Sequence, residues 1–229
     1  ASTKSIELDG ANEYVALPSA AMKSIFNSAS AVTLSAWFKA ASLPGGGQRV
    51  FQMESDDAGG NWLFAIRTSG TAAQIGWRHG ASGTYGLLAG STTLSTDTWY
   101  HVAAVFDGSA TSMKIYIDGS LVGTNTSAGA ALYGGAGSAE KCSIGATGAA
   151  SNPWDGKIDE VAVFSSALTA ENISTIYGPG TPAALTGTAG WWRMGDGTGD
   201  DASTVNDMSG NGNNGTLRNG PTYSTDVPS

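Results

Sequence analysis

The sequence predicts an all-β domain, an antiparallel β-sandwich, on three observations. A dozen short runs rich in β-branched, aromatic and other apolar residues recur between residues 5 and 164. Turn-forming residues separate these runs, and glycine alone supplies 33 of the 229 residues. Charged residues make up only 13% of the chain, which excludes a disordered polypeptide and suits a domain with an ample core.

The runs predict strands at 5–8, 14–17, 32–39, 50–53, 62–67, 74–78, 84–88, 100–107, 112–118, 121–124, 141–144 and 156–164. Asp-Gly pairs at 9–10, 107–108 and 118–119 predict hairpin turns, because both residue types tolerate positive φ.

Two segments predict short helices. Residues 18–26 place their apolar side chains on one side. Residues 169–177 are better marked, because Thr169 is a suitable N-cap and Ile173, Ile176 and Tyr177 follow helical spacing.

Residues 1–229 are expected to form one domain. Residues 5–177 would make the main sandwich, 178–185 a linker, and 186–229 a tail whose strands pack on the same sandwich. The tail carries Trp191 and Trp192, which would be costly to leave exposed.

The charge balance excludes several partners. The 11 Lys and Arg residues against 19 Asp and Glu residues give a net charge of −8 at pH 7. No cluster of Lys and Arg runs along the sequence, so we expect no nucleic acid, no anionic membrane surface, and a neutral rather than a polyanionic glycan as ligand. No apolar run reaches the roughly 18 residues of a membrane span. The single cysteine, Cys142, excludes an intrachain disulfide and a cysteine zinc site.

Three sequence blocks occur in a recognisable order and spacing. They read SIELDGANEYV at 5–15, WYHVAAVFDG at 99–108 and WDGKIDEVAVF at 154–164. Together they resemble the laminin G-like, concanavalin A-type lectin/glucanase family. The resemblance implies a jelly roll of two antiparallel sheets.

The tail resembles a segment that commonly precedes the first block in this family, through GWWRMGDG at 190–197 and DMSGNGNNGT at 207–216. Here it follows the last block, so the jelly roll is either circularly permuted or followed by the opening of a next repeat. The same order is similar to that in virion structural proteins of marine bacteriophages. This likeness implies a place on a virion surface or outside the cell, with other virion or surface domains as partners.

The resemblance also implies a structural calcium. In the family it often lies where the N-terminal turn meets the strand matching 158–161, so Asp9, Asn12 and Asp159 are the expected ligands, with Glu160 as the alternative to Asp159. Their carboxylate and amide oxygens are the donors that calcium prefers. The plainer alternative is a hairpin turn at Asp9 and a strand-edge charge at Asp159.

A hairpin at 76–85 carries the candidate sugar-binding residues. Trp77, Arg78, His79 and Tyr85 surround a Gly/Ser turn, and Trp62 could join them. Sugars are held by aromatic faces with a few polar groups, which this set offers. The alternative is that Trp77 packs inward and only Arg78 is exposed.

These observations predict a non-catalytic carbohydrate-binding or adhesion module with a glycan as partner. One alternative is a purely structural virion decoration domain without a sugar ligand. A second is a glycosidase or polysaccharide lyase, which needs two carboxylates on one strand face. The adjacent pairs 56–57 and 159–160 would face opposite sides of a strand, and neither histidine has the sequence context of a catalytic triad, so we expect no enzyme.

Overall fold

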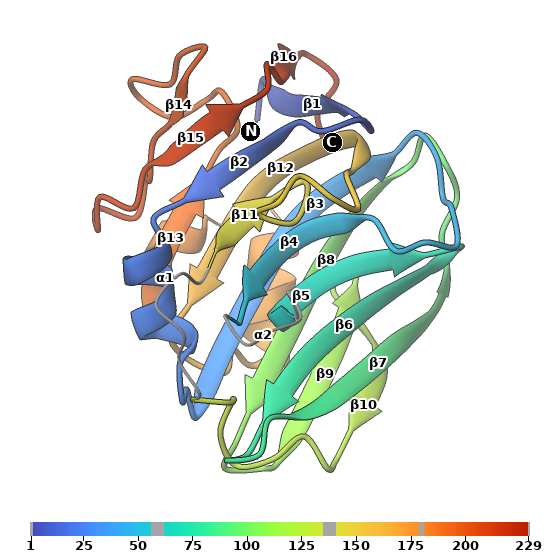
Figure 1. Cartoon of the computed structure of the whole chain (residues 1–229), viewed down its shortest axis with the longest axis vertical. Helices are drawn as coiled ribbons and strands as arrows, with labels where there is room; N and C mark the ends of the chain where they lie inside the picture. The colour runs from blue at the N-terminus through green and yellow to red at the C-terminus, as the bar shows by residue number, and fades with distance from the viewer. Residues whose placement is uncertain (1, 56–61, 135–140, 179–180, 229) are drawn as a thin grey trace.

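A computed structural model describes residues 2–55, 62–134, 141–178 and 181–228 as a sandwich of two antiparallel sheets (Figure 1). Eight strands form each sheet, so the predicted all-β antiparallel sandwich is confirmed. No helix among the described residues is long and apolar enough to cross a membrane.

The first sheet, sheet A, has the order β10-β9-β8-β3-β12-β1-β16, with β13 also paired to β12. Its strands are β1 (Ser5–Asp9), β3 (Ala31–Ala40), β8 (Trp99–Asp107), β9 (Ser112–Ile117), β10 (Ser120–Asn125), β12 (Asp155–Phe164), β13 (Thr188–Trp192) and β16 (Thr222–Ser224).

The second sheet, sheet B, has the order β14-β15-β2-β11-β4-β5-β6-β7. Its strands are β2 (Tyr14–Leu17), β4 (Arg49–Glu54), β5 (Trp62–Ser69), β6 (Ala72–His79), β7 (Thr84–Thr93), β11 (Cys142–Ile144), β14 (Thr204–Val205) and β15 (Gly215–Arg218).

The helices follow the predicted pattern. The two predicted helices are α1 (Ser19–Phe26) and α2 (Ala170–Tyr177), and the short 3-10 helix η1 (Pro182–Ala184) lies in the segment predicted as a linker. Thr169 caps α2, since its hydroxyl accepts a hydrogen bond from the Asn172 backbone N–H. Ile173 and Ile176 are buried in an apolar cluster with residues of β8, β9, β12 and β13. Helix α2 therefore covers part of the outer face of sheet A.

The Asp-Gly turns behave differently from one another. Asp118 and Gly119 both have positive φ, 48° and 74°, and close the tight hairpin between β9 and β10 as predicted. The pair at Asp9 and Gly10 was predicted as a hairpin, and this prediction is wrong. It carries the chain from β1 in sheet A to β2 in sheet B, because each of these strands pairs with other partners.

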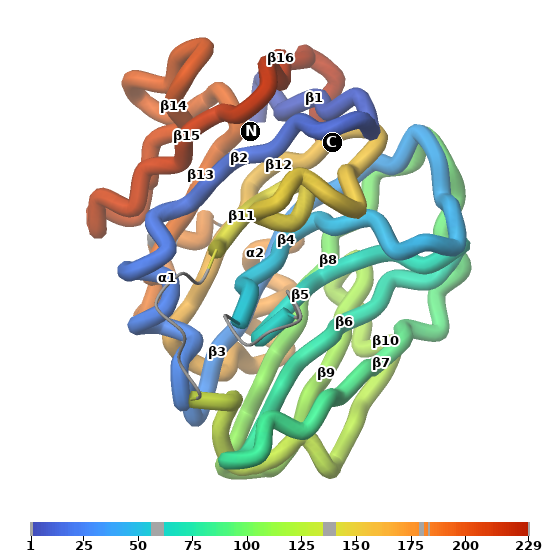
Figure 2. Tube along the Cα trace, viewed as in Figure 1, coloured from blue at the N-terminus to red at the C-terminus, as the bar shows by residue number. Residues whose placement is uncertain are grey.

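The tail adds strands to both sheets. In sheet A, β13 pairs with the second half of β12 and β16 pairs with β1, whereas β15 pairs with β2 in sheet B. Figure 2 shows this orange-to-red segment lying against the blue N-terminal strands. The Asp196 carboxylate reinforces the contact, since it accepts hydrogen bonds from the Thr3 and Lys4 backbone N–H groups at 2.6 and 3.1 Å.

The core lies between the two sheets. Its largest fully buried side chains are aromatic: Trp77, Trp154, Trp192, Phe26, Phe38, Phe51, Phe64 and Phe106. Cys142 is also buried, and burial raises the pKa of its thiol well above the usual value. The cysteine is therefore a small packing residue and not a reactive thiol.

Candidate functional site

The outer face of sheet B carries a group of arginines and aromatic rings. Along β6, Ile75 and Trp77 belong to the core cluster, so the alternate residues Gln74, Gly76 and Arg78 point outward. We call the outward group the arginine–aromatic face, and it consists of Arg49, Trp62, Arg67, Arg78, Tyr85 and Tyr133.

Trp62 is at the centre of this face. Its ring stands directly over Gly76, where a Cβ would lie 2.6 Å from the indole Nε1, so glycine is required there. The guanidinium groups of Arg49 and Arg67 lie 5.3 and 5.4 Å from the Trp62 ring centroid. The ring of Tyr85 meets it edge-on at 6.1 Å.

Tyr85 is the exposed end of the cluster, with 47% of its surface accessible. The Arg78 guanidinium lies 4.7 Å from the Tyr85 ring and 4.3 Å from the Tyr133 ring. Arg78 itself is buried and donates hydrogen bonds to the Gly83 carbonyl at 3.1 Å and to the Ser55 hydroxyl at 2.9 Å. These contacts fix the two tyrosine rings on the surface.

The face carries three arginines, and the carboxylate of Glu54 lies near Arg49. Burial and the neighbouring Arg67 lower the pKa of Arg49 to about 10, although the carboxylate of Glu54 opposes this shift. Burial raises the pKa of Glu54, against hydrogen bonds from the Gly148 backbone and Gln52. Arg49 and Arg67 therefore repel each other, and a negatively charged group placed beside them would relieve the repulsion.

Three of the five predicted sugar-binding residues, Trp62, Arg78 and Tyr85, lie together on this face. Trp77 and His79 do not. Trp77 is 1% exposed in the core, where its Nε1–H donates to the Ala128 carbonyl at 3.2 Å, and His79 stacks on it at 6.5 Å. The reason is strand alternation, since an outward Arg78 forces both of its neighbours inward.

Arg49, Arg67 and Tyr133 were not predicted. Arg49 and Arg67 are directly opposite each other on β4 and β5. Alternation within each strand places them on one side, but only the pairing between strands brings them beside Trp62.

The predicted calcium ligands are not brought together. Asp9 lies opposite Asp155, and Ile6 lies opposite Ile158, so Asp159 is level with Ser5 at the far end of β1. Four residues of strand separate the two carboxylates by about 13 Å, whereas calcium needs its oxygens within about 2.6 Å of the ion. The prediction that Asp9, Asn12 and Asp159 share one calcium site is therefore wrong, because the strand register keeps Asp9 and Asp159 apart.

The alternative ligand Glu160 is also away from the Asp9 turn. Its carboxylate accepts hydrogen bonds from Trp191 and Arg193 in the tail. Among the described residues, no group of three or more His, Cys, Asp or Glu side chains is arranged to hold a metal ion.

The two-sheet architecture, with α2 on one outer face and the arginine–aromatic face on the other, defines a jelly roll. The chain belongs to the Concanavalin A-like lectin/glucanases superfamily, whose family model matches residues 9–174. The family resemblance seen in the sequence is thereby confirmed. No curated protein sequence matches the chain.

Solved structures share the fold at low sequence identity. A protein from Bacteroides ovatus described as carbohydrate-binding matches with a TM-score of 0.72 and 19% identity over 97% of this chain, which spans 59% of that protein. The CBM40 of the Ruminococcus gnavus IT-sialidase, bound to α2,3-sialyllactose, matches with a TM-score of 0.63 and 16% identity, covering 76% of this chain and 96% of that one. A SAP-like pentraxin from Limulus polyphemus matches with a TM-score of 0.58 and 18% identity, covering 78% and 83%.

Proposed function

We propose that this chain is a non-catalytic carbohydrate-binding module that holds a glycan on the arginine–aromatic face. The observation that carries the proposal is the half-exposed Tyr85 beside Trp62 on the open face of sheet B. Two proteins of similar fold support it, since the Bacteroides ovatus protein is described as carbohydrate-binding and the Ruminococcus gnavus module is bound to α2,3-sialyllactose.

The chemistry of the face suits a sugar with a carboxylate. Aromatic rings offer apolar surface to the C–H faces of a sugar, and guanidinium groups donate paired hydrogen bonds to carboxylates. Arg67 is the arginine to test, since it is half-buried and its Nε–H donates to Gln74 at 2.9 Å. This proposal replaces the expected neutral ligand, because the fold gathers arginines that are dispersed along the sequence.

We further propose that the module works at a virion surface or outside the cell, where it adheres to glycans. One site of this kind binds weakly, and repeated copies on a particle or surface would raise the overall affinity. Calcium binding, which the family resemblance implies, stays a separate proposal. The described residues do not bring a set of ligands together for it.

The proposal is tested on a glycan array that holds neutral and sialylated glycans, followed by titration of α2,3-sialyllactose and lactose by calorimetry. Tyr85→Ala is expected to weaken binding at least about tenfold, which corresponds to about 1.4 kcal/mol. Leu121→Ala is the matched control, because Leu121 is 52% exposed on β10 of the other sheet.

Three results would overturn the proposal. Binding unchanged in both Tyr85→Ala and Trp62→Ala would remove the site from this face. An array without any bound glycan would favour the purely structural alternative. Hydrolysis or elimination of a bound glycan would show an enzyme.

A further inference from the structure

A cavity of about 700 Å³ opens on the outer face of sheet A, beside the C-terminal end of α2. It lies on the opposite side of the sandwich from the arginine–aromatic face. We call it the α2 cavity, and six of its lining residues carry the argument: Trp37, His101, Glu160, Tyr177, Trp191 and Arg193. Its volume falls within the range of about 300–1,000 Å³ that small-molecule sites have in proteins.

One wall of the α2 cavity is aromatic. Trp37 stacks on Tyr177 with ring centroids 5.6 Å apart and planes 24° apart. The imidazole of His101 lies 5.3 Å from Trp37 and 5.9 Å from Tyr177. Tyr177 ends helix α2 and is 39% exposed, so this wall extends from the buried floor to solvent.

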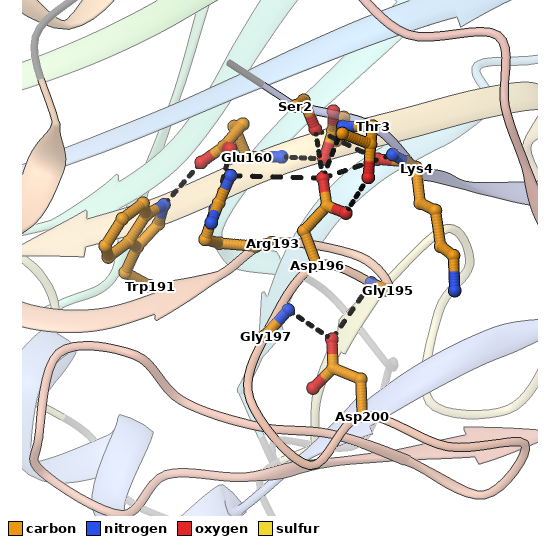
Figure 3. A network of polar contacts seen from close by, with 11 residues as sticks. Ser2, Thr3, Lys4, Glu160, Trp191, Arg193, Gly195, Asp196, Gly197 and Asp200 are labelled. Carbon is orange, nitrogen blue, oxygen red and sulfur yellow. Dashed lines mark hydrogen bonds and ion pairs between the residues drawn. The ribbon is translucent and has the colours of Figure 1, made fainter.

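The opposite wall is an ordered polar arrangement (Figure 3). The Glu160 carboxylate accepts a hydrogen bond from the Trp191 Nε1–H at 2.6 Å and another from the Arg193 Nε–H at 3.1 Å. The Arg193 guanidinium also lies 5.5 Å from the Trp191 ring. The Arg193 guanidinium also lies 3.9 Å from the Asp196 carboxylate, so this wall offers an aromatic surface and an arginine that is already paired with two carboxylates.

The floor contains a buried polar atom without a partner. His101 is 1% exposed, and its Nε2 lies 3.2 Å from the Ser35 hydroxyl. Its Nδ1 is buried and has no hydrogen-bond partner among the described residues. Burial lowers the pKa of His101 to about 3, so the ring is neutral near pH 7. In either tautomer Nδ1 then lacks one hydrogen bond, an omission that typically costs 1–3 kcal/mol.

Hydroxyl groups suit the polar lining of the cavity. A hydroxyl both donates and accepts, so it can donate to the partly exposed Glu160 carboxylate or accept from the Arg193 guanidinium. The imidazole is uncharged and Arg193 is already paired with Glu160 and Asp196, so an anionic ligand gains no advantage here. Aromatic walls around a few polar groups are the usual surroundings of a bound sugar ring.

We propose that the α2 cavity is a second ligand site, which binds a neutral sugar residue between the Trp37–Tyr177 wall and Trp191, above the floor of Ser35 and His101. This site is independent of the arginine–aromatic face. It gives the module two binding faces on opposite sides of the sandwich, one for an acidic and one for a neutral sugar.

The test uses the whole chain, labelled with ¹⁵N, and follows the indole N–H signals of its seven tryptophans. The probes are the methyl glycosides of glucose, galactose, mannose and N-acetylglucosamine. We expect at least one probe to shift the signals of Trp37 and Trp191, while that of Trp62 on the opposite face stays in place. Tyr177→Ala should weaken this binding at least about tenfold, or about 1.4 kcal/mol.

Leu121→Ala is the matched control, since it removes an exposed side chain that does not line the α2 cavity and should leave the probe's affinity unchanged. A second variant, Thr181→Trp, places a bulky side chain on an exposed residue that lines the α2 cavity and should also reduce binding while the aromatic walls stay intact. Thr181→Trp is needed because Tyr177→Ala also removes the ring on which Trp37 stacks, so a loss of binding in Tyr177→Ala alone could come from lost packing.

The α2 cavity proposal fails if no probe shifts Trp37 or Trp191, or if both cavity variants bind as the wild type does. A probe that shifts only Trp62 and is lost in Tyr85→Ala would also overturn it, yet would support the function proposed for the opposite face. Binding at the cavity with no glycan on the arginine–aromatic face would support the α2 cavity proposal and overturn the function proposed for the opposite face. The two proposals can therefore fail separately.

Discussion

Replacing Trp192 should cost this domain a large part of its stability, although the residue lies in the tail. Its side chain is 0% exposed within the core cluster, and its Nε1–H donates to the Asn213 carbonyl at 2.8 Å. A buried Trp→Ala substitution costs about 3–5 kcal/mol through lost burial and the cavity left behind. In a domain of this size 1 kcal/mol lowers Tm by about 2–4 °C, so Trp192→Ala should lower Tm by roughly 6–20 °C.

Scanning calorimetry of the whole chain measures this shift. Leu121→Ala, at a side chain 52% exposed, is the control and should leave Tm within about 2 °C of the wild type. A chain ending at residue 187 should aggregate, because β12, β1 and β2 would each lose a paired strand. A soluble truncated chain with unchanged Tm would refute the reasoning and make the tail a separate unit.

Three further predictions concern charge and metal. Burial raises the pKa of Asp159 to about 8, so the folded state binds this proton more tightly than the unfolded chain, and stability should fall by roughly 2 kcal/mol between pH 6.5 and 8. Urea unfolding should show that fall in the wild type and not in Asp159→Asn. At lower pH the His101 imidazole, with its pKa lowered to about 3, acts in the opposite direction, since its stabilising contribution is lost as pH falls below 6.5. Arg67→Gln should reduce the affinity for α2,3-sialyllactose more than that for lactose, and equal losses would remove the role of its charge. If the domain binds calcium at all, a hundredfold excess over its dissociation constant adds about 2.7 kcal/mol to stability, and a Tm equal in calcium and in chelator would exclude calcium binding.

Much of the fold could be predicted because strands leave a local signal. Each of the twelve predicted runs from residue 5 to residue 164 is a strand in the structure, with bounds shifted by a few residues. Thr169 and the apolar spacing after it likewise located α2. Alternation could also have decided which residues of β6 belong to the arginine–aromatic face, because an outward Arg78 excludes Trp77 and His79.

Features that depend on pairing between distant strands could not be predicted in this way. The Asp9-Gly10 turn has the local chemistry of a hairpin, but whether the chain turns back or crosses to the other sheet depends on which neighbours β1 and β2 find. The arginines of the arginine–aromatic face come together in the same manner, from β4, β5 and β6. Arg49, Arg67 and Arg78 are dispersed along the sequence, so the sequence alone does not indicate that they lie together.

The clearest case is the pair Asp159 and Glu160, which strand alternation places on opposite faces of sheet A. In the structure both Ile158 and Val161 are in the core, so the two residues between them form a bulge on the outer side. Glu160 adopts a φ of 48° there, and the pairing with β3 shifts at the same point. Along β12, the pairing with β1 ends at Ile158 and the pairing with β13 begins at Val161, so the bulge lies between the two partners. It therefore depends on a tail strand almost thirty residues further along the chain. Because of the bulge Glu160 reaches Trp191 and Arg193 and completes one wall of the α2 cavity. A straight strand would direct that carboxylate into the core, and the cavity would lose its polar wall.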